Sequence, residues 1–386
     1  MIKKNYIVLI ILFAILSCQK KEKTTTIISK EEINSKMVDK NATQETKNLY
    51  QNLFILREKG ILFGHQDDLA YGVNWKYEDG RSDVKDVSGD YPAVYGWDVA
   101  GIEKKSALNI DGVPFDKMIQ YIKDVYERGG INTISWHLDN PLNDKNAWDT
   151  SQGSLVSAIP GGVAHTKYKS WLDELISFNS KLLDKNGHPI PILFRPFHEL
   201  TGDWFWWCQN NGSPEEYCKL WKFTVDYLKN KGVHNFIYVY NTSMVNTKED
   251  YLKYYPGSEY VDILSFDNYQ YSDPEKDNSF VENNLKLVRI MDEIAKEQNK
   301  LIAFAETGYE QIPYHKWWTK TLIESLGDYK VSYVLVWRNH GFQEKEKKMH
   351  YYAPFKGHPF EKDFVDFYNL EKTLFQREIT KETIYQ

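Results

Sequence analysis

Cysteine is scarce in this chain of 386 residues, with only three copies. One of them, Cys18, stands near the amino terminus, so Cys208 and Cys218 are the only cysteines of the body. Two cysteines do not make the disulfide framework of a small secreted scaffold. They could form one pair, but Cys218 falls in a predicted helix and is better explained as a buried side chain.

Clusters of lysine and arginine are also missing, and the formal net charge is −6. Binding to nucleic acid, or to a membrane through a polybasic surface, depends on a concentration of positive charge. The body of the chain has no such block. We therefore expect no nucleic-acid partner.

An apolar run stands at the amino terminus. Lys3 and Lys4 precede apolar residues 7–16, a stretch that is too short to span a membrane and that leads into Cys18. This pattern predicts a lipoprotein signal peptide over residues 1–17, after which Cys18 becomes the lipidated amino terminus. An ordinary signal peptide, in which Cys18 is incidental, is the alternative.

Residues 18–39 form a charged and polar segment with little to bury, which predicts a flexible tether. The body would then hang, as a monomer, from the outer membrane of a bacterial cell envelope. The tether does not indicate whether the protein faces the periplasm or the outside of the cell.

Aromatic residues are the compositional excess, with 12 Trp, 27 Tyr and 19 Phe. Such rings fill protein cores, but they also stack on the apolar faces of sugars. Core packing explains most of them, so only rings beside polar groups point to a binding function. One such cluster, Trp204–Trp207, closely follows the charged segment Arg195–Glu199.

The body consists of strand-like runs that alternate with amphipathic helical patterns. Eight strand-like runs are present: Ile61–Gln66, Tyr91–Asp98, Ile131–Leu138, Pro191–Glu199, Asn235–Asn241, Val261–Tyr269, Lys300–Thr307 and Val331–Asn339. Helices are predicted from apolar residues at three- and four-residue spacing over Phe115–Arg128, Tyr168–Lys185, Pro214–Lys229, Phe280–Gln298 and Lys316–Leu326. Residues 67–90 contain no convincing helical pattern.

Apolar strands that alternate with amphipathic helices predict a parallel sheet covered by helices. Eight such units predict an α/β fold, a single (β/α)8 TIM barrel over residues 40–375, with residues 376–386 as a C-terminal tail. A doubly wound open sheet is the structural alternative. No Gly-rich phosphate fingerprint follows any strand, so the usual cofactor signal of that alternative is absent.

Charged or aromatic residues stand at seven of the eight predicted strand ends. In a barrel the carboxyl ends of the strands meet at one face, where such residues converge on a cavity. Glu199 ends the fourth strand and Glu306 ends the seventh, so the two glutamates are expected to face each other across the barrel mouth. A rim glutamate held only by a salt bridge is the structural alternative for each of them.

Two glutamates beside aromatic rings suit the hydrolysis of a glycosidic bond. One carboxyl must be protonated to donate to the leaving oxygen, and the other must be ionised to attack the anomeric carbon. Glu199 is the better acid/base, because apolar walls from Trp204–Trp207 would raise its pKa. Glu306 is the better nucleophile, because Tyr269 could donate a hydrogen bond that holds its charge.

The motifs around these residues resemble those of the glycoside hydrolase family 26 β-mannanases, which are retaining barrel enzymes. The matching segments are Arg195-Pro-x-His-Glu199, Gly202-x-Trp-Phe-Trp-Trp207, Trp136-His137 with Asn140-Pro141, Ser265-x-Asp-x-Tyr269 and Ala305-Glu306-Thr-Gly308. The likeness spans residues 50–365. It implies that Glu199 is the acid/base and Glu306 the nucleophile.

The same resemblance implies a set of residues around the substrate. His198 and Tyr269 would orient the nucleophile, and Trp337 would form a platform beneath the sugar whose bond is cut. Apart from the resemblance, Asp267 in the sixth strand could either bind a sugar hydroxyl or tie down that strand. The full set of substrate-binding residues is His137, Trp148, Arg195, His198, Trp204, Asp267, Tyr269 and Trp337.

Other polar and aromatic clusters have plainer explanations. His198–Glu199 lacks the second histidine of a zinc-protease helix, so we expect no metal site. His65, Asp67 and Asp68 fit a hydrogen-bonded network at the barrel rim better than a set of metal ligands. Trp206–Trp207 is as compatible with packing as with contact to substrate.

We therefore expect a retaining β-1,4-mannanase that acts on mannan or galactomannan, either internally or by releasing mannobiose. A β-1,3-xylanase or mixed-linkage β-glucanase is the rival within the family, because those specificities use the same catalytic residues. A non-catalytic glycan-binding surface lipoprotein is the rival from another class. None of these functions requires a cofactor, and the sequence offers no site for one.

Overall fold

The computed structural model describes residues 30–386. The signal peptide expected at residues 1–17, Cys18 and most of the expected tether lie outside the described residues. Within the described part, no helix has the length and apolar character needed to cross a membrane.

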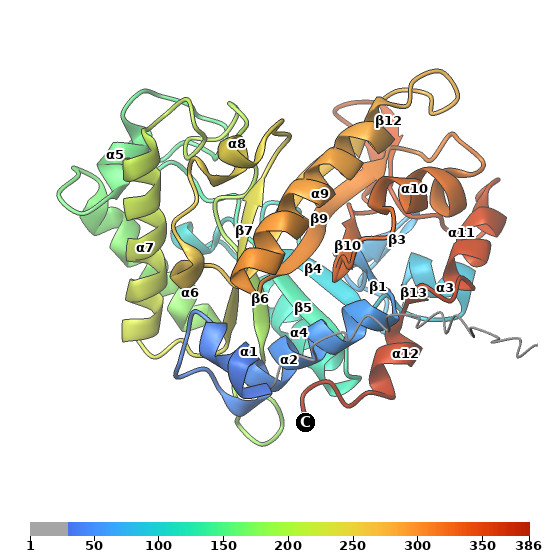
Figure 1. The fold of residues 1–386 in the computed structure, drawn as a ribbon, viewed down its shortest axis with the longest axis horizontal. Coiled ribbons are helices and arrows are strands. Elements are labelled where there is room, and N and C mark those ends of the chain that lie inside the picture. Colours follow the sequence, from blue (N-terminus) through green and yellow to red (C-terminus); the bar gives the residue numbers. More distant parts are fainter. Residues whose placement is uncertain (1–29) are drawn as a thin grey trace, which may run out of the picture.

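Eight parallel strands form a closed barrel (Figure 1). Strand β1 pairs with β4 on one side and with β10 on the other, which closes the sheet. The barrel strands are β1 (Ile61–Gln66), β4 (Val94–Asp98), β5 (Ile131–Ser135), β6 (Ile192–Arg195), β7 (Phe236–Thr242), β8 (Ile263–Gln270), β9 (Leu301–Tyr309) and β10 (Tyr333–Val336). The predicted (β/α)8 barrel is thus confirmed.

Helices surround this barrel and connect its strands. The longer ones are α2 (Gln44–Lys59), α4 (Phe115–Glu127), α6 (His165–Asn179), α7 (Pro214–Asn230), α9 (Ser279–Gln298) and α11 (Glu361–Tyr368). Shorter ones are α3 (Asp83–Ser88), α5 (Ser154–Ala158), α8 (Lys248–Leu252) and α10 (Ile323–Leu326), together with a π-helical turn at Trp317–Leu322 and 3-10 turns at Ile102–Lys104 and Ser258–Tyr260.

The start of α7 illustrates how local sequence sets these boundaries. The Ser213 side chain accepts a hydrogen bond from the backbone of Glu216, whose own side chain accepts one from the backbone of Ser213. Pro214 occupies the first helical position, where its missing N–H costs nothing. This capping box begins the helix at the residue that the sequence predicted.

The connection between β1 and β4 is mostly irregular, as expected from the missing helical pattern. It contains a small antiparallel pair, β2 (Tyr71–Gly72) and β3 (Trp75–Lys76), followed by the six-residue helix α3. A second antiparallel pair, β11 (Gly341–Gln343) and β12 (Lys348–His350), follows β10. Both pairs are additions to the barrel.

The packed body is longer than the sequence predicted at both ends. The expected tether of residues 18–39 already contains helix α1 (Lys30–Lys36), and Met37 and Val38 behind it are buried. The Val38 amide donates a 2.8 Å hydrogen bond to the buried carboxylate of Asp262. The tether boundary at residue 39 is therefore wrong, because the apolar residues of this segment pack against the barrel.

The C-terminal residues also belong to the packed body. Strand β13 (Thr373–Leu374) pairs with β1, and helix α12 (Gln376–Thr380) follows it. Ile379 and Ile384 are buried within the predicted tail. In Figure 1, α12 and the C-terminus lie at the lower edge with α1 and α2, away from α5, α8 and β12 at the upper edge.

The barrel interior changes from apolar to polar along the strands. Inward-facing Leu193, Ile237, Ile263 and Leu301 belong to one buried apolar cluster at the amino ends of their strands. Further along the same strands stand Arg195, Asn241, Asp267 and Glu306, which are all buried. A polar layer therefore replaces the apolar filling at the carboxyl ends of the strands.

Candidate active site

A cleft of about 670 Å³ lies at the carboxyl ends of the barrel strands. Both glutamates singled out by the sequence line it. The remaining lining residues are His137, Trp148, Thr201, Gly202, Trp204, Phe205, Ser243, Met244, Asp267, Asn268, Tyr269, Tyr271, Trp337 and Tyr352. Aromatic rings thus flank two carboxylates at the barrel face where TIM barrels place their chemistry.

Glu306 reaches the cleft because β9 contains a bulge. Phe304 is opposite Phe266 of β8, but the next pair along the ladder is Glu306 with Asp267, so β9 has one extra residue. The ladder with β10 shifts over the same stretch. A bulge changes the face to which the following side chains point. The cleft consequently receives Glu306 directly after the inward-facing Ala305.

Three groups hold Glu306 and its neighbour Asp267 in place. Arg195 donates from Nη2 to Oε2 of Glu306 at 2.7 Å, and from Nη1 to Asp267. The Tyr269 hydroxyl donates to Oε1 of Glu306 at 2.5 Å. Asn241 donates to Oδ1 of Asp267 at 2.7 Å. Both oxygens of Glu306 thus accept hydrogen bonds, which stabilises the ionised carboxylate that a nucleophile needs.

Glu199 lies in a strained turn rather than on a strand. Strand β6 ends at Arg195, and both Phe197 and Glu199 have positive φ, at 51° and 55°. Such a conformation is uncommon for residues other than glycine and persists where the surroundings enforce it.

Hydrogen bonds from two neighbouring segments fix this turn. The Glu199 amide donates to Oδ1 of Asn241 at 2.7 Å, and the Trp207 indole donates to the His198 carbonyl at 2.8 Å. The Trp204 indole donates to Oε2 of Glu199 at 2.6 Å. Because backbone and carboxylate are both held, the position of Glu199 is fixed.

The environment of Glu199 favours the protonated acid. Burial, followed by the charge of Glu306, raises the pKa of Glu199 to about 7. Arg195 and the Trp204 hydrogen bond oppose this shift. A carboxyl with a pKa near neutrality can donate a proton in one step and accept one in the next.

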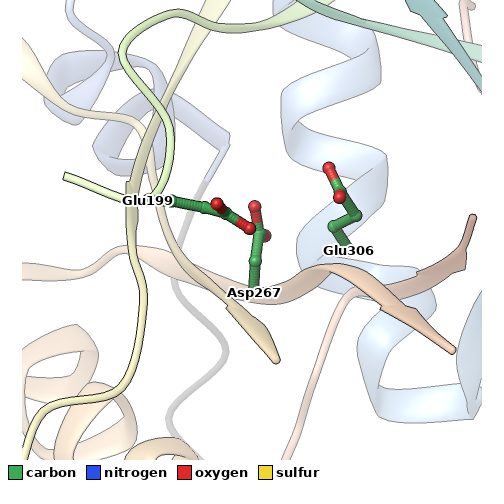
Figure 2. A group of neighbouring side chains, drawn as sticks. All are labelled: Glu199, Asp267 and Glu306. Carbon is green, nitrogen blue, oxygen red and sulfur yellow. The ribbon is translucent and has the colours of Figure 1, made fainter. Parts of the chain in front are cut away.

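Three carboxylates meet at the centre of the cleft. Glu199, Asp267 and Glu306 each place one oxygen within 4.8 Å of the others. Figure 2 shows Glu199 reaching toward Asp267 from its turn, with Glu306 on the adjoining strand. Such a trio has the donor atoms of a cation site, but the guanidinium of Arg195 already pairs with Asp267 and Glu306. Arg195 therefore offsets part of the negative charge of the trio.

A chain of two histidines and an aspartate borders the site. His137 lines the cleft, and its Nδ1 lies 2.7 Å from Asp98 while its Nε2 lies 3.1 Å from Nε2 of His198. Burial opposes the charge on His137, but Asp98 raises its pKa above the ordinary value. Burial and the charges of His137 and Arg195 lower the pKa of His198 well below the ordinary value.

Two predicted substrate-binding residues lie behind the cleft wall. Arg195 and His198 are only 3% and 1% exposed, and neither lines the cleft. His198 also makes its side-chain hydrogen bond to His137, whereas Tyr269 is the residue that holds Glu306. Of the two residues expected to orient the nucleophile, Tyr269 donates a hydrogen bond to Glu306, whereas the hydrogen bond of His198 is made with His137.

Three of the predicted tryptophans are wall residues. Trp148 is 47% exposed and stacks on His137 with ring centroids 5.3 Å apart, and Trp337 faces the same histidine edge-on. Trp204 is 39% exposed beside Glu199. Gly202 leaves room for this ring, because a Cβ there would come within 2.6 Å of it. All three tryptophans line the cleft, together with Asp267.

Comparison with known proteins agrees with this geometry. Residues 38–350 match the model of glycosyl hydrolase family 26. The chain belongs to this family. Among solved structures, a family 26 β-mannanase from Bacteroides ovatus is similar over 89% of this chain and 98% of that one, with 42% identity and a TM-score of 0.84.

Further family 26 relatives give the same picture. A modular endo-β-1,4-mannanase from Cellulomonas fimi covers 89% of this chain and 78% of its own, with 34% identity and a TM-score of 0.79. A mannan endo-1,4-β-mannosidase from Bifidobacterium adolescentis is 30% identical over 87% of this chain. The present chain spans only 35% of the length of that relative.

Several residues that line the cleft were not predicted from the sequence. Tyr271 follows β8, Tyr352 follows the β11–β12 pair, and Met244 follows β7. All three stand in loops without a periodic pattern. Asn241, which holds both the Glu199 amide and Asp267, ends a predicted strand and could have been suspected from that position.

The other polar, aromatic and cysteine residues singled out by the sequence lie outside the cleft lining. His65 and Asp68 form a buried 2.7 Å pair, and the Tyr71 hydroxyl donates to Asp67, so this group is a hydrogen-bonded network. Trp206–Trp207 is fully buried and packs rather than lining the cleft. Cys208 and Cys218 are free thiols.

Proposed function

We propose that the chain hydrolyses β-1,4 bonds of mannan or galactomannan with net retention, with Glu199 as acid/base and Glu306 as nucleophile. The observation that carries the proposal is that one carboxylate oxygen of Glu199 and one of Glu306 lie within 4.8 Å of each other. Retaining glycosidases hold their carboxyl groups roughly 5–5.5 Å apart, whereas inverting ones leave about 6.5–9.5 Å for a water molecule. The short separation supports direct attack by Glu306.

In the first step, Oε1 or Oε2 of Glu306 forms a bond to the anomeric carbon. The bond between that carbon and the bridging oxygen breaks, and the bridging oxygen takes the proton of Glu199. Tyr269 and Arg195 keep Glu306 ionised before attack. As the glycosyl ester forms, Glu306 loses its charge and Glu199 gains one.

In the second step, Glu199 accepts a proton from water while the water oxygen attacks the anomeric carbon. The ester bond to Glu306 breaks, which restores both carboxyl groups to their starting states. A pKa of about 7 at Glu199 suits both directions of proton transfer near neutral pH. The anomeric centre is inverted twice, so its configuration is retained.

The substrate class is supported by the relatives. The Bifidobacterium adolescentis relative and a Bacillus subtilis relative, which is 28% identical over 70% of this chain, are both named mannan endo-1,4-β-mannosidases. A rival substrate has narrower support, because a 94-residue stretch is 33% identical to endoglucanase H of Acetivibrio thermocellus. The name of that relative supports a β-glucan as the second candidate substrate.

Reducing-sugar release from mannan, galactomannan, β-1,3-xylan and lichenan tests the substrate class. We expect release from the two mannans, and loss of it in Glu306→Ala. Release from lichenan or β-1,3-xylan without release from mannan would overturn the proposal. Binding to mannan without release from any polysaccharide would favour a non-catalytic glycan-binding protein.

The time course on mannohexaose then distinguishes internal cleavage from release of mannobiose. A mixture of oligosaccharides at early times indicates an open cleft and internal cleavage. Mannobiose as the sole early product indicates a cleft closed at one end. Of the long connections near the cleft, the segment after β5 supplies Trp148 to its wall.

The proposed location is the cell envelope, with a lipid on Cys18. Eleven residues separate Cys18 from the first residue of α1. At about 3.3–3.6 Å per residue, such a segment reaches at most about 40 Å. Metabolic labelling with a fatty-acid probe tests the proposal: wild type should carry the label in the membrane fraction, and Cys18→Ala should not. Equal labelling of both proteins would contradict it.

A further inference from the structure

Tyr271 is the most exposed aromatic side chain of residues 30–386, at 86%. Single exposed rings are ordinary on protein surfaces. This one is unusual in its place, because it lines the catalytic cleft one residue after the end of β8. No function assigned above uses it.

Tyr271 extends an aromatic wall that begins at the nucleophile. Tyr269, which donates to Glu306, has its ring centroid 6.4 Å from that of Tyr271 and 5.5 Å from that of Tyr352. All three tyrosines line the cleft. The wall therefore runs from the reacting centre outward to a ring that is open to solvent.

The inner part of this wall is rigidly built. The Tyr352 ring lies over Gly308, where a Cβ would come within 2.2 Å of it. The Tyr352 amide donates a 2.9 Å hydrogen bond to Asn339, which also donates to the Ala353 carbonyl and to Asp83. A fixed inner wall gives the outer ring a defined position relative to a bound chain.

We propose that Tyr271 forms a sugar subsite on the leaving-group side of the cleavage point, where its ring stacks on a residue of the departing chain. The inference rests on the glycosidase function proposed above and deepens it. Aromatic rings offer a flat apolar face to the C–H face of a pyranose, with a hydroxyl at the edge. The proposed subsite is occupied by a sugar residue of the same polysaccharide chain.

The position of the acid Glu199 determines on which side of the cleavage point Tyr271 lies. Glu199 protonates the bridging oxygen, so the departing sugars lie on its side of the reacting centre. In the barrel order β10–β9–β8–β7–β6, Tyr271 follows β8, on the side of Glu306 that leads toward Glu199 after β6. Trp337, the expected platform of the reacting sugar, follows β10 on the other side of Glu306.

The test compares substrates with and without a sugar on the leaving-group side. For Tyr271→Ala in the full chain, we expect kcat/KM on mannohexaose to fall about three- to tenfold, the loss expected for one aromatic contact. We expect kcat/KM on an aryl β-mannobioside, whose leaving group is not a sugar, to stay within about twofold. Tyr271→Phe should keep most of the activity on mannohexaose.

A partition measurement sharpens the test. The glycosyl-enzyme divides between water and an added mannobiose acceptor, and the acceptor must occupy the leaving-group side. Tyr271→Ala should lower the ratio of transfer to hydrolysis. Phe342→Ala is the matched control, because Phe342 is 50% exposed on β11 and does not line the cleft. Phe342→Ala should leave both the ratio of transfer to hydrolysis and kcat/KM on mannohexaose unchanged.

Two outcomes would overturn the inference. An equal loss on the aryl substrate and on mannohexaose would place Tyr271 at the reacting sugar or on its other side. Unchanged mannohexaose kinetics and unchanged partition would show that the ring contacts no sugar. Failure of the proposed substrate class is a separate result, because the wild-type protein would then be inactive on mannan. The same comparison would then be made with oligosaccharides of the polysaccharide that the wild-type protein does cleave.

Discussion

The indole nitrogen of Trp204 donates a 2.6 Å hydrogen bond to Oε2 of Glu199. This bond favours the ionised carboxylate, whereas burial and the charge of Glu306 favour the acid and together raise the pKa of Glu199 to about 7. One hydrogen bond thus limits how far the pKa of the proton donor rises. The balance keeps Glu199 able to act in both steps of a double displacement.

Trp204→Phe tests this balance, because it removes the N–H donor and keeps an apolar ring. Loss of a hydrogen bond to the charged form makes ionisation harder, so the pKa of Glu199 should rise. The alkaline limb of kcat/KM, where the acid is lost, should therefore move to higher pH than in wild type. A pH–rate profile on mannohexaose measures this shift of the alkaline limb. An alkaline limb that moves to lower pH would contradict the account.

Tyr269→Phe tests the support of the nucleophile. The Tyr269 hydroxyl donates a 2.5 Å hydrogen bond to Glu306, and a hydrogen bond to a charged group is worth about 1.5–3 kcal/mol. We expect kcat to fall about 10- to 100-fold. Tyr227→Phe removes a hydroxyl that donates to Asp173 and that does not line the cleft, so it is the control and should stay near wild type. Full activity of Tyr269→Phe would show that the hydrogen bond plays no part in turnover.

Asp98→Asn tests the histidine chain. Asp98 lies 2.7 Å from Nδ1 of His137 and raises the pKa of that imidazole against the effect of burial. Removing the charge should therefore lower the pKa of His137, as followed by NMR titration of the ring protons. Asp39→Asn removes the carboxylate that pairs with His234 at 2.8 Å and should leave His137 unchanged. An unaltered pKa of His137 in Asp98→Asn would show that the pairing with Asp98 is not what raises this pKa.

The barrel was predictable because its pattern repeats. Apolar runs such as Ile131–Leu138 alternate with amphipathic patterns such as Phe115–Arg128, and each prediction supports the next. The exact ends were less predictable. Strand β6 stops at Arg195, four residues before the predicted end, because a turn with positive φ at Phe197 and Glu199 follows. The side chains of these residues carry no signal for that conformation.

The bulge in β9 is a second feature that sequence periodicity cannot indicate. Leu301, Ala303 and Ala305 alternate as inward residues, so strict alternation would turn Glu306 toward the helices. The extra residue that redirects it is set by pairing with β8 and β10. Motif resemblance pointed to Glu306, which lines the cleft, and only the three-dimensional ladder explains how it enters there.

Residues in irregular segments were the least predictable part of the site. Tyr271 and Tyr352 enter the cleft from loops whose course depends on contacts such as Asn339 with the Tyr352 amide. For the amino-terminal segment, the sequence predicted less packing than the structure has. Its polar composition suggested a free tether, but Met37 and Val38 pack against the barrel.

The assignment of the two glutamates is tested most directly by azide rescue. In Glu199→Ala, Glu306 can still form the glycosyl-enzyme from a substrate with a good leaving group, and azide can then attack without base assistance. We predict restored turnover and a β-mannosyl azide, identified by NMR, in which the configuration is retained. Rescue of Glu306→Ala with retention, or an α-mannosyl azide from Glu199→Ala, would contradict the roles assigned to the two residues.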